Sequence, residues 1–515
     1  MQEAAVAQNW FATLALLAWP FVALWLYQMR PVNQATLWTI LGGYLLLPVG
    51  ASIKLAEGIP QLDKISVPAL AALVGCFFFA RRALRFWNGF GLAEVLVLIY
   101  VISPFVTSRL NSDPAVSGAV VLPAVGSYDG LSAIVGQLLF LLPFFLGRQL
   151  LRNSAGIEEA LRTLILAGLL YSLPMLFEIR MSPQLHHWLY GYYSFGFATQ
   201  VRQGGFRPSV FLENGLVATF FLMTAVVAAT AFWRSRTRVV QKLPPPAVTA
   251  YLGAILILCK SLGALVYGVL AIPLVRLARP RLQLRIAMIL ATLAVSYPLL
   301  RTADLVPINY MVEAARYRSD DRADSLQFRF DHEKEMLDRA SQRIMFGWGR
   351  WGRSRIYDDW GNDISVTDGR WAITLGQFGI VGFLAEFGLL ALTVFRAARA
   401  LKFAETERDS IFLGALALII AINMIDLLPN ASLGPWTWLL AGALLGRAEA
   451  LRGAARQLRR FDRLAGAGLG AERVASQGNS VPTPLRAAQP DPHQSLTEFS
   501  APQQFNTKPL PSYEK

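Results

Sequence analysis

The sequence predicts an all-α fold, a polytopic membrane bundle of about 12–13 transmembrane helices with one large loop on the outer side. Three observations lead to this prediction. Of the 515 residues, 54% are hydrophobic and only 16% are charged, whereas a soluble domain carries about 25% charged residues. The apolar residues form long blocks, and the loops between the blocks alternate between rich and poor in basic residues. The pattern excludes a soluble enzyme, a secreted disulfide scaffold and a transmembrane β-barrel, whose strands would be about ten residues of alternating polarity.

Thirteen apolar blocks of roughly 15 to 25 residues are each able to cross a hydrocarbon core of about 30 Å. Lys260 interrupts the stretch 247–276, which is therefore either two short spans joined by a tight turn or one broken helix. The predicted spans are 10–28, 35–53, 65–80, 91–108, 131–147, 160–179, 213–233, 247–259, 261–276, 283–300, 371–395, 410–428 and 434–447.

The distribution of basic residues predicts the orientation of the spans. The loops expected on the cytoplasmic side hold eighteen basic residues, whereas the alternate short loops hold seven. Because basic short loops stay in the cytoplasm, the C-terminus is predicted inside and, with thirteen spans, the N-terminus outside. The start of the chain has no basic n-region and no obvious cleavage site, so the first block is predicted to be a retained helix rather than a signal peptide.

The chain divides into four regions. Residues 1–300 are N-terminal spans that include an outer loop at 181–212, residues 301–370 are the large outer loop, and residues 371–447 are the C-terminal spans. Residues 448–515 are polar and predict a disordered, basic cytoplasmic tail, which is either a solvated tether or a contact with anionic lipid. The net charge of +14 is mostly the topology signal. No nucleic-acid partner is predicted, because a soluble basic module with a known motif is missing from the sequence.

The sequence predicts neither a metal nor a cofactor. Cys76 and Cys259 both lie in apolar blocks and suggest neither a disulfide framework nor a zinc site. The spacing of the acidic residues resembles no metal site, and His186 and His187 are adjacent rather than on one helical face. The sequence also contains no Walker motif and no dinucleotide fingerprint.

The outer loop 181–212 combines aromatic residues with two arginines. Most of its rings fit the aromatic belt of a membrane surface, and Tyr193 is also a candidate for sugar binding. Arg202 and Arg207 are five residues apart, separated by a Gly-Gly pair and followed by a proline, in a short stiff segment. Guanidinium forks suit phosphate oxygens, so this segment predicts a diphosphate site; the alternative is an outer loop that is merely basic.

Ionisable side chains inside apolar blocks indicate further candidates. Lys260 lies near the outer end of its block, where it is either a third cation for the diphosphate or a side chain that snorkels to the headgroups. Glu94, Glu178, Glu386 and Asp426 lie within or at the ends of spans. Glu386 is the deepest of them, and a proton-coupled role stays open for it.

The large outer loop carries the remaining candidates. Residues 325–337, which include Arg329, have the pattern of an amphipathic helix lying across the mouth of the bundle. Asp368 stands directly before a span, where an acid is either a general base or, as is more usual, the N-cap of the helix. The candidates for sugar binding in this loop are Trp348, Trp351 and Arg370.

In the order of these features, the chain resembles the O-antigen ligase and polysaccharide polymerase superfamily of bacterial envelope enzymes. The resemblance covers roughly residues 35 to 445, and order and topology carry it together rather than any single motif. The features are the many spans with a large outer loop ahead of the last few, the segment 202–207 followed by a span, the run from Ser325 through Arg329 to Gly347-Trp348-Gly349, the entrance 368–371 and the helix 375–382.

The resemblance implies a multi-pass glycosyltransferase of the bacterial inner membrane, with a periplasmic large loop and a cytoplasmic C-terminus. The family transfers glycan from a polyprenyl diphosphate carrier at the outer face of that membrane. By this resemblance, Asp368 would accept the proton of the acceptor hydroxyl in an inverting transfer. Arg202 and Arg207, together with Arg329 or Lys260, would stabilise the departing diphosphate.

Two departures from the family pattern favour an exopolysaccharide, capsule or O-antigen polymerase over a ligase. Many members carry a His where this chain has Asp368, and the Ser-Arg-Gly turn of ligases reads Ser261-Leu262-Gly263 here. The ligase, which transfers glycan to a lipid A core, stays open as an alternative. A transporter or flippase of lipid-linked sugars is a third hypothesis, although it should show internal repeats and midplane charges.

The partners implied are a polyprenyl diphosphate-linked glycan, a growing polysaccharide or lipid acceptor, and the membrane lipids. A chain-length regulator or an export complex is a further candidate partner.

Overall fold

A computed structural model describes residues 9–54, 60–81, 89–202, 204–239, 242–317, 320–366 and 368–477. The chain forms two compact units, residues 1–456 and residues 457–515. The described part of the second unit is the last stretch of one long helix, which ends at Gln477. The fold described below is that of the first unit.

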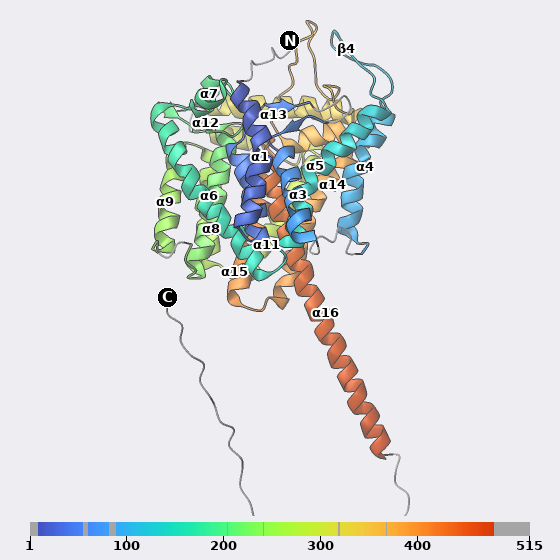
Figure 1. Ribbon diagram of the computed structural model, residues 1–515. Helices are drawn as coiled ribbons and strands as arrows, with labels where there is room; N and C mark the ends of the chain where they lie inside the picture. The colour runs from blue at the N-terminus through green and yellow to red at the C-terminus, as the bar shows by residue number, and fades with distance from the viewer. Residues whose placement is uncertain are drawn as a thin grey trace, which may run out of the picture. The chain divides into compact units, whose positions relative to one another are not determined.

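Each of the thirteen predicted spans coincides with a helix of the structure, and three further α-helices of the described residues lie in the loops 181–212 and 301–370 (Figure 1). The helices are α1 (Trp10–Met29), α2 (Val32–Leu46), α3 (Ser66–Ala80), α4 (Leu92–Arg109), α5 (Ser127–Leu150), α6 (Ser154–Met181), α7 (Leu185–Tyr190), α8 (Gly215–Arg234), α9 (Pro245–Leu258), α10 (Leu262–Leu277), α11 (Pro280–Thr302), α12 (Ile308–Arg316), α13 (Asp320–Ser341), α14 (Arg370–Ala400), α15 (Glu407–Asp426) and α16 (Pro435–Gln477).

The prediction of a polytopic helical bundle is confirmed. Among the described residues, eight helices are long and apolar enough to cross a membrane, namely α1, α4, α5, α6, α8, α11, α14 and α15. Helices α3, α9 and α10 are apolar but shorter. Nearly all of α8 and α15 is buried, so these two form the centre, whereas less than half of α1 and of α11 is buried, so these two lie on the outside of the bundle.

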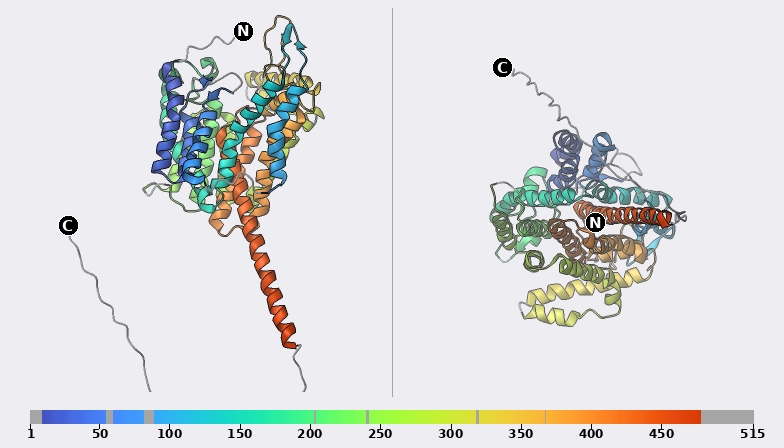
Figure 2. Two further views of the ribbon diagram at one scale, coloured as in Figure 1. Left: turned by 45° about the vertical axis from the view of Figure 1, so that its right-hand side comes forward. Right: turned by 90° about the horizontal axis from the view of Figure 1, so that it is seen from below.

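The strands of the described ranges are short and lie in the loops, where they form three antiparallel hairpins. They are β1 (Ser52–Ile53) with β2 (Leu62–Asp63), β3 (Ala115–Ser117) with β4 (Val120–Leu122), and β5 (Val201–Arg202) with β6 (Gly205–Phe206). Helices α7 and α13 and the β3–β4 hairpin lie at one end of the bundle, here called the loop end (Figures 1 and 2).

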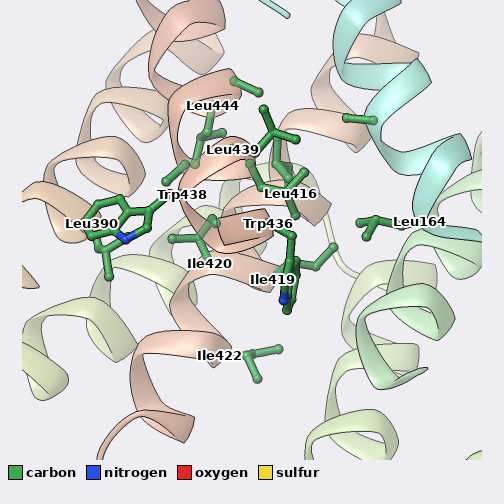
Figure 3. Packing of buried hydrophobic residues seen from close by; sticks show 14 of the residues in the cluster. Leu164, Leu390, Leu416, Ile419, Ile420, Ile422, Trp436, Trp438, Leu439 and Leu444 are labelled. Atoms are coloured by element: carbon green, nitrogen blue, oxygen red, sulfur yellow. The ribbon is translucent and has the colours of Figure 1, made fainter. Parts of the chain in front are cut away.

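The core is built from large apolar side chains of α6, α14, α15 and α16, several of which Figure 3 shows around Trp438 and Ile420. Small residues let two of the elements touch at the backbone. A Cβ at Gly147 of α5 would lie 2.1 Å from the carbonyl oxygen of Leu439 in α16, and one at Gly442 would lie 2.0 Å from that of Phe144. Such close approach is the usual way in which helices associate where water provides no hydrophobic drive.

Helix α14 is broken at Gly379, whose φ of 66° no interior helical residue adopts. The loop segment 344–349 runs against the break and bonds its exposed backbone groups. Ile380 N–H donates to Ile344 O at 2.7 Å, and Trp348 N–H donates to the carbonyl oxygen of Gly376 at 2.9 Å. The break is therefore tolerated because another part of the chain satisfies the freed groups. The Gly347-Trp348-Gly349 run and the helix 375–382 of the sequence therefore contact each other through their backbones.

Helix α13 contains the predicted amphipathic stretch 325–337 and lies crosswise over the loop end (Figure 1). Arg301 at the end of α11 anchors it, because Arg301 Nε donates to Glu333 at 2.8 Å and Nη2 donates to the Phe330 carbonyl at 3.2 Å. The hydroxyl of Tyr297 donates to the same carboxylate. The prediction of a helix across the mouth of the bundle is confirmed, and its position is fixed by the span that precedes it.

Two expectations are settled by the helix boundaries. The stretch 247–276 is two helices, α9 and α10, joined by a turn at residues 259–261. The prediction of a disordered tail from residue 448 is wrong for its first thirty residues, because α16 continues to Gln477. Residues 448–477 are rich in Ala, Arg and Leu, which are strong helix formers, so a low content of large apolar residues did not mean disorder. Residues 478–515 lie outside the described part of the chain.

Candidate functional site

Four predicted cations come together at the loop end, and we call Arg202, Arg207, Lys260 and Arg329 the cation cluster. Lys260 Nζ donates to the carbonyl oxygen of Arg202 at 3.3 Å. Burial, together with the charges of Arg202 and Arg329, lowers the pKa of Arg207 to about 10. The structure thus joins the loop before α8, the α9–α10 turn and α13, which are far apart in the sequence.

Arg207 is the central member of the cluster. Its side chain is only 8% exposed, and among the described residues its Nε has no hydrogen-bond partner. The stem passes so close to the start of α8 that a Cβ at Gly215 would lie 2.4 Å from Arg207 Cγ. The backbone around it is held, because Arg207 N–H donates to the carbonyl oxygen of Gln200 at 2.9 Å and the side-chain oxygen of Gln200 accepts from Gly215 N–H at 3.2 Å. A buried cation held in place without a counter-charge favours an anionic ligand.

Gly204 and Gly205, which lie between Arg202 and Arg207, shape the contact of this hairpin with Lys260. Gly204 has φ of +69°, which closes the turn between β5 and β6. A Cβ at Gly205 would lie 2.4 Å from Lys260 Nζ, so a larger residue there would displace the ammonium group. Lys260 itself has φ of +53° in the α9–α10 turn. Two tight turns thus bring the lysine onto the arginine hairpin.

Asp368 faces the cluster from the start of α14. Its carboxylate oxygen lies 3.6 Å from Arg329 Nε, and both side chains are about half exposed. The N-cap of α14 is Gly369, with no side-chain capping bond. The alternative of Asp368 as the N-cap is therefore wrong. An exposed pair at this distance contributes little to stability, so the carboxylate is available for chemistry.

Arg370 does not have the exposed position expected of a sugar-binding residue. It makes a bidentate ion pair with Glu386, with Nε at 2.8 Å and Nη2 at 2.6 Å from the two carboxylate oxygens. Thr374 Oγ1 donates to the same carboxylate at 3.0 Å, and Glu386 is wholly buried. The pairing explains how a carboxylate is tolerated at this depth: the first residue of α14 neutralises it.

Trp348 and Trp351, the two tryptophans predicted to bind sugar, differ in their exposure. Trp348 is buried, its indole N–H donates to the Arg339 carbonyl at 2.8 Å, and the guanidinium groups of Arg339 and Arg343 lie 3.7 Å and 4.5 Å from its ring. A ring covered in this way cannot stack on a sugar, so Trp348 is a structural residue. Trp351 is exposed, and its N–H donates to Asp129 of α5 at 3.2 Å, which ties it to α5.

Tyr193 is connected to the arginine hairpin through ring contacts. Its ring is 44% exposed and stacks on His187 with 4.6 Å between centroids. Phe197 contacts Tyr193 on one side and Phe206 of β6 on the other. A row of aromatic rings thus extends from Tyr193 to the arginine hairpin, where a sugar attached to a bound phosphate would meet it.

Sequence reasoning missed an electrostatically coupled pair, Lys64 and Glu213. Lys64 is 4% exposed and donates to the Phe211 carbonyl at 2.9 Å. Burial lowers the pKa of Lys64 to about 8 and raises that of Glu213, and each charge opposes the shift of the other. Glu213 directly precedes Asn214, the N-cap of α8. Lys64 was counted only as a topology signal, because nothing in the sequence places it against Glu213.

No protein-family model matches the chain, and no curated protein matches it. Chemically, the arrangement offers three guanidinium groups and one ammonium group for a polyanion, with a carboxylate beside them that can accept a proton.

Proposed function

We propose that the protein polymerises lipid-linked oligosaccharide repeat units into an exopolysaccharide, capsule or O-antigen, by inverting glycosyl transfer from a polyprenyl diphosphate carrier. The observation that carries the proposal is Arg207, a buried guanidinium whose Nε lacks a partner in the described part of the chain, within a cluster of four cations that faces Asp368. The resemblance to the O-antigen ligase and polysaccharide polymerase superfamily supports it, because that family uses outer arginines for the same ligand.

The charge of the cluster favours a diphosphate over a single carboxylate or sulfate. Arg202 and Arg329 both repel Arg207, so the empty site is electrostatically unfavourable and a ligand with several negative charges relieves it. Guanidinium forks bind phosphate oxygens in pairs. Since the site lies at the end of apolar helices, a diphosphate carried on a lipid can reach it from the membrane.

The transfer follows from these positions. Asp368 accepts the proton of the acceptor hydroxyl while the hydroxyl oxygen attacks the anomeric carbon. The bond between that carbon and the diphosphate oxygen breaks, and its electron pair leaves with the diphosphate. The cation cluster stabilises the charge that develops there, and a preorganised donor of this kind contributes about 3 kcal/mol. The hydroxyl attacks from the side opposite the departing diphosphate, which inverts the configuration of the anomeric carbon.

The proposed location is the bacterial inner membrane, with α13 on the periplasmic face and the C-terminus in the cytoplasm. The bias of basic residues in the short loops supports this orientation. The cation cluster then lies at the outer leaflet, where the carrier presents completed repeat units. The proposed partners are the lipid-linked glycan and the growing chain, and a chain-length regulator or export complex is a further proposal.

The test is the length of the polymer in cells that carry Asp368→Asn. The amide preserves the shape of the side chain and cannot accept the proton. We therefore expect the amount of long polymer to fall at least a hundredfold, with the level of the protein in the membrane unchanged. Asp359→Asn, which changes an exposed aspartate of the same loop, is the matched control and leaves the polymer intact. Normal polymer length in the Asp368→Asn cells contradicts the proposal.

The products in the Asp368→Asn cells separate the proposal from its alternatives. A polymerase defect leaves single repeat units on the carrier at the outer face. A ligase defect leaves long polymer on the carrier without transfer to the lipid A core. A flippase defect traps single units at the inner face.

A further inference from the structure

A second cationic site lies at the end of the bundle opposite the loop end. A cavity of about 300 Å³ opens there between the start of α4, the end of α5, the end of α14 and the α16 stretch before residue 457. We call it the basal pocket. Its charged lining residues are Glu94, Arg148, Arg396, Glu449, Arg452 and Arg456.

The arginines of the basal pocket fall into two groups. Arg148 is buried and bonded to both acids, with Nη2 at 2.6 Å from Glu94 and at 2.7 Å from Glu449. For Arg396, Arg452 and Arg456, no carboxylate of the described residues lies within ion-pair distance. Both carboxylates of the pocket are therefore paired with Arg148, and Arg396, Arg452 and Arg456 line the same cavity without an ion pair among the described residues.

These cations repel one another. Burial and the charges of Arg396, Arg456 and Arg399 together lower the pKa of Arg452, which only Glu449 opposes. Arg396 and Arg452 are half-buried, so solvent screens their repulsion incompletely. An anion in the cavity would relieve the repulsion without moving the helices.

The start of α4 also borders the cavity, and the carboxylate of Glu94 in its first turn is paired with Arg148. Gly91 is the N-cap of α4 and provides no side-chain cap, and Gly91, Ala93 and Glu94 line the cavity. The N-terminus of a helix carries a partial positive charge and backbone N–H groups that suit phosphate. Arginines and a helix start therefore converge on one cavity.

The rim of the pocket is apolar. Phe90, which lines the cavity, is 69% exposed, and Leu92 in the first turn of α4 is 53% exposed. Large apolar side chains next to cations, at the end of helices that can cross a membrane, mark the level of lipid headgroups. Basic pockets between spans bind anionic headgroups in this way.

We propose that the basal pocket binds the phosphate of an anionic lipid headgroup. The site is separate from the cation cluster and does not depend on the proposed function. A free phosphate ester shares the same chemistry, and the experiment below distinguishes the two sources. The lipid would hold the start of α4, the end of α14 and α16 together through one shared anion.

The test uses the purified full-length protein in detergent micelles, titrated with phosphatidylglycerol and, in parallel, with phosphatidylcholine. The double variant Arg396→Gln/Arg452→Gln removes two cations of the pocket and leaves Arg148 with both its acids. The matched control is Arg281→Gln/Arg285→Gln, which removes two exposed arginines of α11 at the same end of the bundle. Arg452→Gln alone is a milder variant for the case in which the double variant unfolds. Thermal unfolding of each variant checks that it is folded.

We expect phosphatidylglycerol, and not phosphatidylcholine, to bind the unsubstituted protein saturably. The pocket double variant should bind it about thirtyfold more weakly and Arg452→Gln about fivefold more weakly, with the control unchanged. Equal affinity of the unsubstituted protein and the pocket variant overturns the site, as does an equal loss in the control variant. Soluble glycerol phosphate at the same concentration should not compete, and competition by it overturns the lipid source. Substrate plays no part in the measurement, so its outcome is independent of the glycosyl transfer.

Discussion

Arg447 and Arg207 are buried to nearly the same extent, 6% and 8% exposed, yet their surroundings are opposite. Arg447 of α16 makes two bonds to the buried Asp409 of α15, at 3.1 Å and 2.7 Å. Arg207 has no bond at Nε to any residue that the structure describes and is repelled by two other arginines. Burial therefore does not separate structural cations from functional ones. These two arginines differ in their counter-charge: Asp409 pairs with Arg447, whereas no carboxylate of the described residues pairs with Arg207, which fits the proposed anionic ligand.

The largest effect is expected at the paired arginine. Asp409→Asn leaves Arg447 buried beside a neutral group, and breaking a buried pair costs about 3–5 kcal/mol. We expect the melting temperature of the purified protein to drop by several degrees, together with its level in membranes. Arg447→Met combined with Asp409→Leu, which removes both charges, should restore most of the stability. An unchanged melting temperature for Asp409→Asn would contradict the structural role of the Arg447–Asp409 pair.

Arg207→Gln tests the functional role proposed for Arg207. It removes a buried cation that has neighbours of like charge, so we expect the melting temperature of the unliganded protein to stay the same or to rise. Transfer activity should fall about a hundredfold, which corresponds to about 3 kcal/mol. Polymer synthesis by membranes and thermal unfolding of the purified protein measure the two effects separately. A large loss of stability would show that Arg207 supports the fold.

Two companion variants sharpen this result. Arg207→Lys keeps the charge and loses the fork, so an activity about tenfold below normal is expected, and full activity contradicts the guanidinium role. Arg180→Gln removes an exposed arginine at the end of α6 and should leave both activity and stability unchanged.

The sequence predicted the helices of the bundle and much of the cation cluster. Long apolar blocks identify spans because each must bury an uninterrupted apolar length. The alternation of the loops then placed Arg202, Arg207 and Lys260 on one side before any contact was known. The convergence of Arg329 and Asp368 on that side follows from the amphipathic helix and from the position of Asp368 directly before α14.

The partners of individual side chains could not be predicted. Glu386 lies sixteen residues from Arg370, but whether the arginine faces the carboxylate or a ligand depends on the turn that begins α14. The aromatic character of Trp348 suggests sugar stacking, and only the fold shows two arginines against its ring. The break at Gly379 is likewise invisible, because its meaning lies in the distant segment that bonds to it.

His186 extends the comparison to a third buried group, in the same loop as Arg207 but with both polar atoms satisfied. Its Nε2 accepts from Val49 N–H at 3.2 Å, so Nδ1 carries the proton and donates to the Tyr192 carbonyl at 2.8 Å. Burial, helped by the charge of Lys64, lowers the pKa of His186 to about 4. The imidazole is therefore neutral at pH 7 and serves the fold.

The pH dependence of stability tests this assignment. Between pH 6.5 and about 4 the unfolded chain binds a proton that the folded protein does not, so stability falls as the pH falls through this window. From pH 7 to pH 5 the loss from this residue is about 2 kcal/mol. His186→Gln, which offers a donor and an acceptor without titrating, should reduce the drop in melting temperature between these two pH values. His187→Gln, at the exposed neighbour, should leave the drop unchanged. If both variants retain the full drop, His186 is charged in the folded protein, and satisfied polar atoms do not distinguish the structural groups of this loop from Arg207.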